Sequence, residues 1–203
     1  MLGGNGVLLQ DGLVYTGNSS ATAPLIACDL TLGANQTFSA SRGINLAGRV
    51  DLNGRTLTVS PSASGNMFFS GVLTDSTGTG QLNKTNTGLM VISPTAQVSG
   101  MTMTVQSGTL RVDGLVTNAP VSIRAPLASP VGTAVLAGSG FVHSAGVSDT
   151  ISPGNNSPGI LRMGYLGLAG GASCGTFCTL PAGTFVAELN GTIAGPALPE
   201  EVE

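Results

Sequence analysis

Few side chains in this sequence could do chemistry, and its single histidine is the first to consider. His143 lies in a Ser/Gly-rich stretch, and Asp149 follows it closely in the sequence. Catalysis by a Ser-His-Asp triad would have to use His143 as its base. A lone histidine in such a stretch is more often a surface residue. We therefore predict no catalytic residue, and expect that the chain is not an enzyme.

Paired carboxylates are the other catalytic arrangement to consider, because most glycoside hydrolases use two of them. A stacked fold could bring Asp51, Asp75 and Asp113 together at steps of about 4.8 Å. Each of them stands beside residues typical of turns, so we expect all three to form turns. Aromatic side chains that could hold a sugar are also few: two Tyr, six Phe and no Trp. A β-helix enzyme that degrades polysaccharides therefore stays the alternative hypothesis.

The three cysteines complete the reactive side chains. Cys174 and Cys178 enclose Gly-Thr-Phe, a spacing that permits a small-loop disulfide in an oxidising compartment. A zinc site would need a second cysteine pair or a nearby histidine, and the sequence offers neither. Cys28 is expected to be a small buried hydrophobic residue. We predict no metal site and no cofactor, since calcium-binding repeats and a complete dinucleotide fingerprint are both missing.

The charge pattern excludes several kinds of partner. Only 8% of the 203 residues are charged, and Lys and Arg together number seven. Three of the ten acidic residues lie near the C-terminus, so the rest of the chain is formally neutral. Without a basic patch, the sequence favours neither nucleic-acid binding nor attraction to an anionic membrane. No apolar stretch approaches the roughly 18 residues of a spanning helix.

Short alternating runs of apolar and polar residues are the main structural signal. They recur about every 10–13 residues and end at Gly, Asn, Asp, Ser or Pro, which predicts short β-strands with one buried face. Examples are residues 44–52, 57–59, 89–93, 101–105 and 110–112. Helical periodicity is almost absent. The elements that must position any site are therefore strands and tight turns.

These strands predict an all-β fold, namely a right-handed parallel β-solenoid (β-helix) of about 7–10 short turns with roughly 20–30 residues each. Three features favour it: the strands are short, cross-strand charge pairs are scarce, and small or unbranched apolar residues recur. Residues 1–195 are expected to form one domain, and residues 196–203 an acidic tail or linker. A β-sandwich is the alternative, because Asn53-Gly54, Asp113-Gly114 and Asn190-Gly191 also suit hairpin turns.

Residues 72–191 resemble the passenger domains of bacterial autotransporters, in particular the autotransporter-associated β-strand repeat. Residues 78–93 read GTGQLNKTNTGLMVIS, and residues 98–114 continue as VSGMTMTVQSGTLRVDG. The double Pro-Gly turn of residues 151–161, ISPGNNSPGIL, is the most specific motif of the resemblance. Residues 184–191, TFVAELNG, are similar to the strand that usually follows. The resemblance implies a solenoid that is extracellular or at the bacterial cell surface, attached to the outer membrane in the parent protein.

We therefore expect an extracellular structural or adhesive protein, a passenger-type surface stalk or scaffold segment. Self-assembly into fibres through the solenoid ends is a variant of this hypothesis, because open strand edges invite stacking. The expected partners are further copies of the chain or an unidentified host or environmental surface ligand. Neither nucleic acid nor membrane insertion of this segment is expected. A glycan- or receptor-binding tip is a further alternative, since Thr, Ser and Asn side chains can present hydroxyls and amides.

Overall fold

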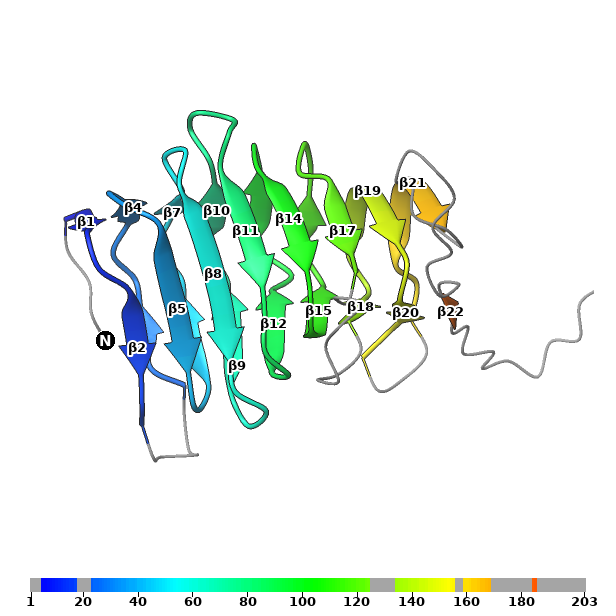
Figure 1. Cartoon of the computed structure of the whole chain (residues 1–203), viewed down its shortest axis with the longest axis horizontal. Coiled ribbons are helices and arrows are strands. Elements are labelled where there is room, and N and C mark those ends of the chain that lie inside the picture. The colour runs from blue at the N-terminus through cyan, green and yellow to red at the C-terminus, as the bar shows by residue number, and fades with distance from the viewer. Residues whose placement is uncertain (1–4, 18–22, 125–133, 156–158, 169–183, 186–203) are drawn as a thin grey trace, which may run out of the picture.

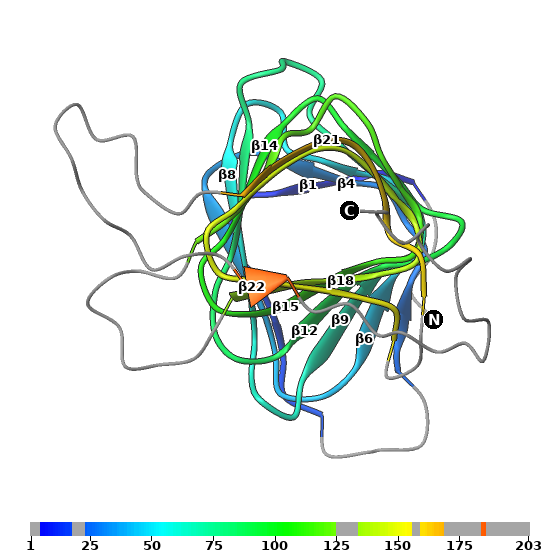
Figure 2. The same cartoon turned by 90° about the vertical axis from the view of Figure 1, so that its right-hand side faces the viewer.

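The computed structural model describes residues 5–17, 23–124, 134–155, 159–168 and 184–185, and its elements are all strands (Figure 1). These residues form no helix that could span a membrane. The strands stack into three columns along the long axis of the molecule, so that the chain winds around an enclosed interior (Figure 2).

Each turn contributes one strand to each column. Column 1 contains β1 (Val7–Leu9), β4 (Leu30–Leu32), β7 (Val50–Asp51), β10 (Val72–Thr74), β13 (Gln97–Ser99) and β16 (Leu115–Val116). Column 2 contains β2 (Leu13–Tyr15), β5 (Gln36–Ala40), β8 (Thr56–Pro61), β11 (Gln81–Lys84), β14 (Thr102–Val105) and β17 (Val121–Ile123). Column 3 contains β3 (Leu25–Ile26), β6 (Ile44–Leu46), β9 (Asn66–Phe69), β12 (Leu89–Ile92), β15 (Gly108–Val112), β18 (Ala134–Gly138), β20 (Thr150–Pro153) and β22 (Thr184–Phe185). Two longer strands, β19 (Phe141–Val147) and β21 (Arg162–Leu168), run through columns 1 and 2.

All pairs between these strands are parallel, which confirms the predicted β-solenoid. One register row of column 1 runs through Val7, Leu30, Val50, Leu73, Val98, Val116, Val142 and Met163. The solenoid has about seven turns, at the lower end of the predicted range. The β-sandwich alternative is wrong, because a sandwich is built from antiparallel strands.

Alternate residues of each strand point inward and form a continuous apolar core. Leu57, Leu82 and Met103 lie in one inward row of column 2 and are 0–1% exposed. Stacked turns place similar side chains directly above one another at about 4.8 Å. This arrangement explains why the core is rich in Leu, Val and Met and contains few large rings.

Tight corners connect the columns, and several of them need unusual backbone geometry. Asn53 and Gly54 both have positive φ, at 49° and 74°. They connect β7 to β8, which lie in different columns, so the hairpin interpretation of this pair is wrong. The predicted strand over residues 44–52 is split into β6 and β7. A Cβ on Gly48 would clash with the carbonyl of Cys28 in the preceding turn. The close approach of the two backbones at this bend therefore requires a glycine.

Candidate functional site

Asp51 and Asp75 lie at the same corner, between columns 1 and 2, in successive turns. The Asp51 carboxylate accepts hydrogen bonds from the backbone N–H groups of Asn53 and Ser76, both at 3.0 Å, and forms an ion pair with Arg49. Ser76 belongs to the following turn, so this carboxylate links two turns. These contacts fit the predicted role of Asp51 as a turn former.

The Asp75 carboxylate accepts still more hydrogen bonds from the residues of this corner. It is 5% exposed and accepts hydrogen bonds from the N–H groups of Gly54 at 2.6 Å and Gly80 at 2.7 Å. The Thr77 hydroxyl donates to the same carboxylate. Burial alone would raise the pKa of Asp75, but these donors outweigh it and hold the pKa below its ordinary value of 3.8. Such a carboxylate stays ionised and is unsuited to act as a general acid.

Asp113 lies at a different corner, between columns 3 and 1. It accepts a hydrogen bond from the backbone N–H of Ser139 at 3.2 Å, and its Oδ2 lies 2.8 Å from Nε of Arg111 as an ion pair. The structure therefore brings Asp51 and Asp75 to one corner and leaves Asp113 apart. A site that combines all three carboxylates, which stacking could have produced, does not form, because the repeat length places Asp113 after a column-3 strand.

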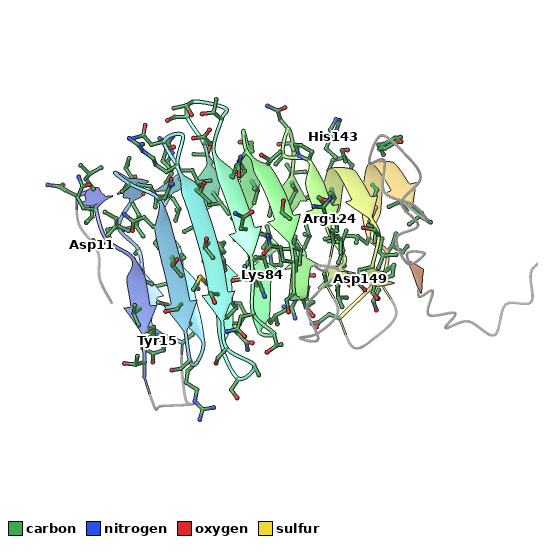
Figure 3. All side chains as sticks on the ribbon, in the orientation of Figure 1. Asp11, Tyr15, Lys84, Arg124, His143 and Asp149 are labelled. Carbon is green, nitrogen blue, oxygen red and sulfur yellow. The ribbon has the colours of Figure 1, made fainter. Side chains whose placement is uncertain are left out.

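His143 and Asp149 do not come together either. His143 is exposed on β19, and Figure 3 shows it at the opposite edge of the solenoid from Asp149. The Asp149 carboxylate accepts a hydrogen bond from the N–H of Ala134 at 2.8 Å and one from the Thr150 hydroxyl. The exposed setting agrees with the prediction that His143 is a surface residue.

One serine motif was missing from the sequence predictions. Residues 171–175 read Gly-Ala-Ser-Cys-Gly and fit the Gly-x-Ser-x-Gly pattern of a nucleophile elbow. Such an elbow needs a strand-to-helix turn. Ser173 lies outside the described residues, so no distance connects it to His143.

Of the three cysteines, Cys28 alone lies among the described residues. Cys28 is buried, with 3% exposure, which confirms its predicted role as a small core residue. Cys174 and Cys178 lie outside the described residues, so the disulfide stays a prediction. Within the described part of the chain, His, Cys, Asp and Glu side chains form no group of three or more that could hold a metal ion.

Lys84 is a buried charge that the sequence predictions missed. It is 0% exposed and occupies an inward row between Val59 and Val105. Its ammonium turns to the corner and donates to the carbonyls of Thr85, Asn86 and Ser107 at 2.7–2.9 Å. Burial lowers the pKa of Lys84 from 10.5 to about 8. The available signal was its position, since the alternation of β11 points this lysine inward.

The most extensive polar feature is the outer surface of column 2, which we call the column-2 face. It consists of three register rows, and its members share uncharged side chains with hydroxyl or amide groups. The rows are Asn35, Thr56, Gln81 and Thr102; Thr37, Thr58, Asn83, Thr104 and Ser122; and Ser39, Ser60, Thr85 and Gln106. The first charged side chain along this face is Arg124, which follows β17.

Most side chains of the column-2 face form no hydrogen bond within the described structure, so their donors and acceptors are available to a ligand. Among its members in the described structure, Asn35 alone uses its side chain, accepting from the N–H of Thr56 at 2.9 Å. Thr58, Asn83 and Thr104 of the central row are half-buried and have no side-chain partner among the described residues. Stacking repeats these donors and acceptors at about 4.8 Å. The face can therefore offer many weak hydrogen bonds to an extended polar surface.

Comparison with known protein families, curated proteins and solved structures gives no match for this chain.

Proposed function

We propose that the chain is an extracellular structural or adhesive β-solenoid, a passenger-type segment that holds the column-2 face against a surface. The observation that carries this proposal is the column-2 face itself, an uncharged polar surface that continues over four turns and reaches a fifth only in its central row, at Ser122. A repeated array of hydroxyls and amides along one side of the molecule suits contact with an extended hydroxyl-rich surface more than capture of one small molecule, for which a single enclosed pocket is typical.

The extracellular setting rests on the resemblance of residues 72–191 to autotransporter passengers. The composition agrees with it, because only 8% of the residues are charged while Ser, Thr, Asn and Gly are abundant. A neutral face would bind through hydrogen bonds and not through charge. Its binding should therefore depend little on ionic strength.

A depletion assay with insoluble neutral polysaccharides tests this proposal. The labelled full chain is mixed with cellulose, chitin or xylan particles at 50 mM and 500 mM salt, and the unbound protein is measured. We expect depletion on at least one polysaccharide, unchanged by salt and absent for the heat-unfolded chain. Failure to bind any of these surfaces at either salt concentration would contradict the adhesive role.

The same samples distinguish adhesion from the enzymatic alternative. After incubation, the supernatant is analysed for reducing ends and soluble oligosaccharides. The proposal expects no release above the level of the particles alone. Release that requires the folded chain would replace the adhesive function by a polysaccharide-degrading one.

A further inference from the structure

The first turn of the solenoid leaves inward-facing apolar side chains uncovered. Val7 of β1 is 39% exposed, whereas Leu30, its partner in the next turn, is 3% exposed. Leu13 of β2 is half-buried, whereas its partner Phe38 is 0% exposed. These side chains occupy core rows, and one additional turn would remove them from water.

The backbone at the same end is also unpaired. Within the described structure, β1, β2 and β3 each pair with one neighbour and leave the other edge free (Figure 1). A hollow of about 380 Å³, lined by apolar side chains including Leu13, Tyr15 and Ile26, opens beside these strands. Unpaired strand edges next to exposed apolar side chains are a template for further parallel strands.

The other end of the described solenoid has matching properties. In β21, Leu168 is 51% exposed, whereas its partner Val147 in β19 is 0% exposed. Met163 is half-buried, and its partner Val142 is 0% exposed. Both ends of columns 1 and 2 therefore expose the side chains that continue the core rows.

We propose that the β21 end of one copy stacks on the β1–β2 end of a second copy, head to tail. The core rows fix the register of this contact. The row that begins at Val7 ends at Met163, and the row that begins at Leu13 ends at Leu168. Stacking in register places apolar residues opposite each other in both rows. A contact between two different ends does not close on itself, so it continues into a linear fibre.

This inference deepens the proposed structural role and rests on it, because a fibre repeats the column-2 face along its length. The two proposals fail separately. A chain that remains monomeric can still bind a polysaccharide, and a chain that forms fibres can fail to bind one.

Sedimentation velocity of the full chain over a hundredfold concentration range tests the stacking. We expect the average mass of wild type to rise with concentration. Val7→Asp and Leu168→Asp, one at each end, should each weaken association at least tenfold. The control Val72→Asp changes a 41% exposed valine of β10 in the middle of the solenoid, and should associate like wild type. Circular dichroism and urea unfolding verify that each variant is folded.

Mixing the two end variants gives the sharpest result. The Val7→Asp chain keeps an intact β21 end, and the Leu168→Asp chain keeps an intact β1–β2 end. An equimolar mixture should therefore form dimers and stop there, at concentrations where each variant alone stays monomeric because its association is weakened. A monomeric wild type, a monomeric mixture, or equal loss of association in Val72→Asp would overturn the proposal. The mixture keeps this test valid even if one variant is less stable.

Discussion

Asp75 and Lys84 show how single charged residues hold the corners of the solenoid. Both are buried, and both bond to backbone groups of more than one turn. Asp75 accepts from Gly54 in the preceding turn, and Lys84 donates to Ser107 in the following one. Each therefore satisfies backbone groups that a sharp corner would otherwise leave without partners.

Asp75→Asn should lower the free energy of unfolding by about 1–3 kcal/mol at pH 7, because an amide cannot accept from all of these donors. The folded-state pKa of Asp75 lies below 3.8. Its stabilising effect is therefore complete above pH 3.8 and is lost as the pH falls below that value. Urea unfolding at pH 7 and pH 3 should show a smaller difference at pH 3. The exposed Asp11→Asn is the control, and an equal difference at both pH values would contradict the account.

Lys84→Met should also destabilise the chain at pH 7, by about 1–3 kcal/mol, because buried carbonyls lose their donor. With a folded-state pKa of about 8, Lys84 is charged at pH 7. Between pH 8 and 10.5 the unfolded lysine binds a proton that the folded one releases, so wild-type stability contains a contribution that rises with pH. The difference between wild type and variant should widen from pH 8 to pH 10 in chemical unfolding. A constant or shrinking difference would show that Lys84 does not titrate as described.

At the scale of elements, the corners depend on a few glycines for different reasons. Gly108 has a φ of 71°, and a Cβ there would lie 2.6 Å from the carbonyl of Asn86 and 2.8 Å from Nζ of Lys84. Gly78 has a φ of 76° but open space around it. Gly146 has no positive φ, and a Cβ at this position would have no atom within 4 Å.

Alanine at these three positions should therefore give graded effects. Gly78→Ala should cost about 1–2 kcal/mol from backbone strain alone, and Gly108→Ala should cost more because it adds a clash. Gly146→Ala should change stability by less than about 0.5 kcal/mol. Urea unfolding midpoints measure the series. Equal losses at all three sites, or a larger loss at Gly146, would contradict the described corners.

The strands themselves were predictable from the sequence because alternation survives in nearly every one of them. The column to which each strand belongs was harder to predict from the sequence. Asp113 follows a column-3 strand and not a column-1 strand, and turns vary from 18 residues between Val98 and Val116 to 26 between Val116 and Val142. This variation shifts turn residues between corners, so sequence spacing alone could not tell which carboxylates would meet.

The column-2 face was only partly visible in the sequence. The abundance of Thr, Ser and Asn indicated polar ladders, but not which column they would share. Thr58, Asn83 and Thr104 become neighbours because β8, β11 and β14 pair in register. For Lys84 the sequence shows the position but not the partners. Alternation points this lysine inward, and only the structure reveals the corner carbonyls that stabilise its buried charge.

In the whole molecule, the apolar surfaces and the polar surface lie on different sides of the solenoid. Apolar side chains fill the interior and reappear at the two ends, while the column-2 face stays polar and uncharged along the side. The proposed adhesion and the proposed self-association therefore use surfaces that do not overlap. Substitutions on one surface should leave the function of the other intact.

We propose the column-2 face as the adhesive contact, and paired lysine substitutions on and off this face separate its contribution from that of the other surfaces. Thr58→Lys with Thr104→Lys adds two charges to this face, one in the turn before Asn83 and one in the turn after it. The control pair, Thr74→Lys with Thr117→Lys, adds the same charges to column 1 around Ser99, at equally half-buried threonines. Binding to the polysaccharide that retains wild type is then measured by depletion. We expect at least tenfold weaker binding for the column-2 pair and unchanged binding for the control pair. Equal effects of the two pairs would contradict the adhesive role of the column-2 face.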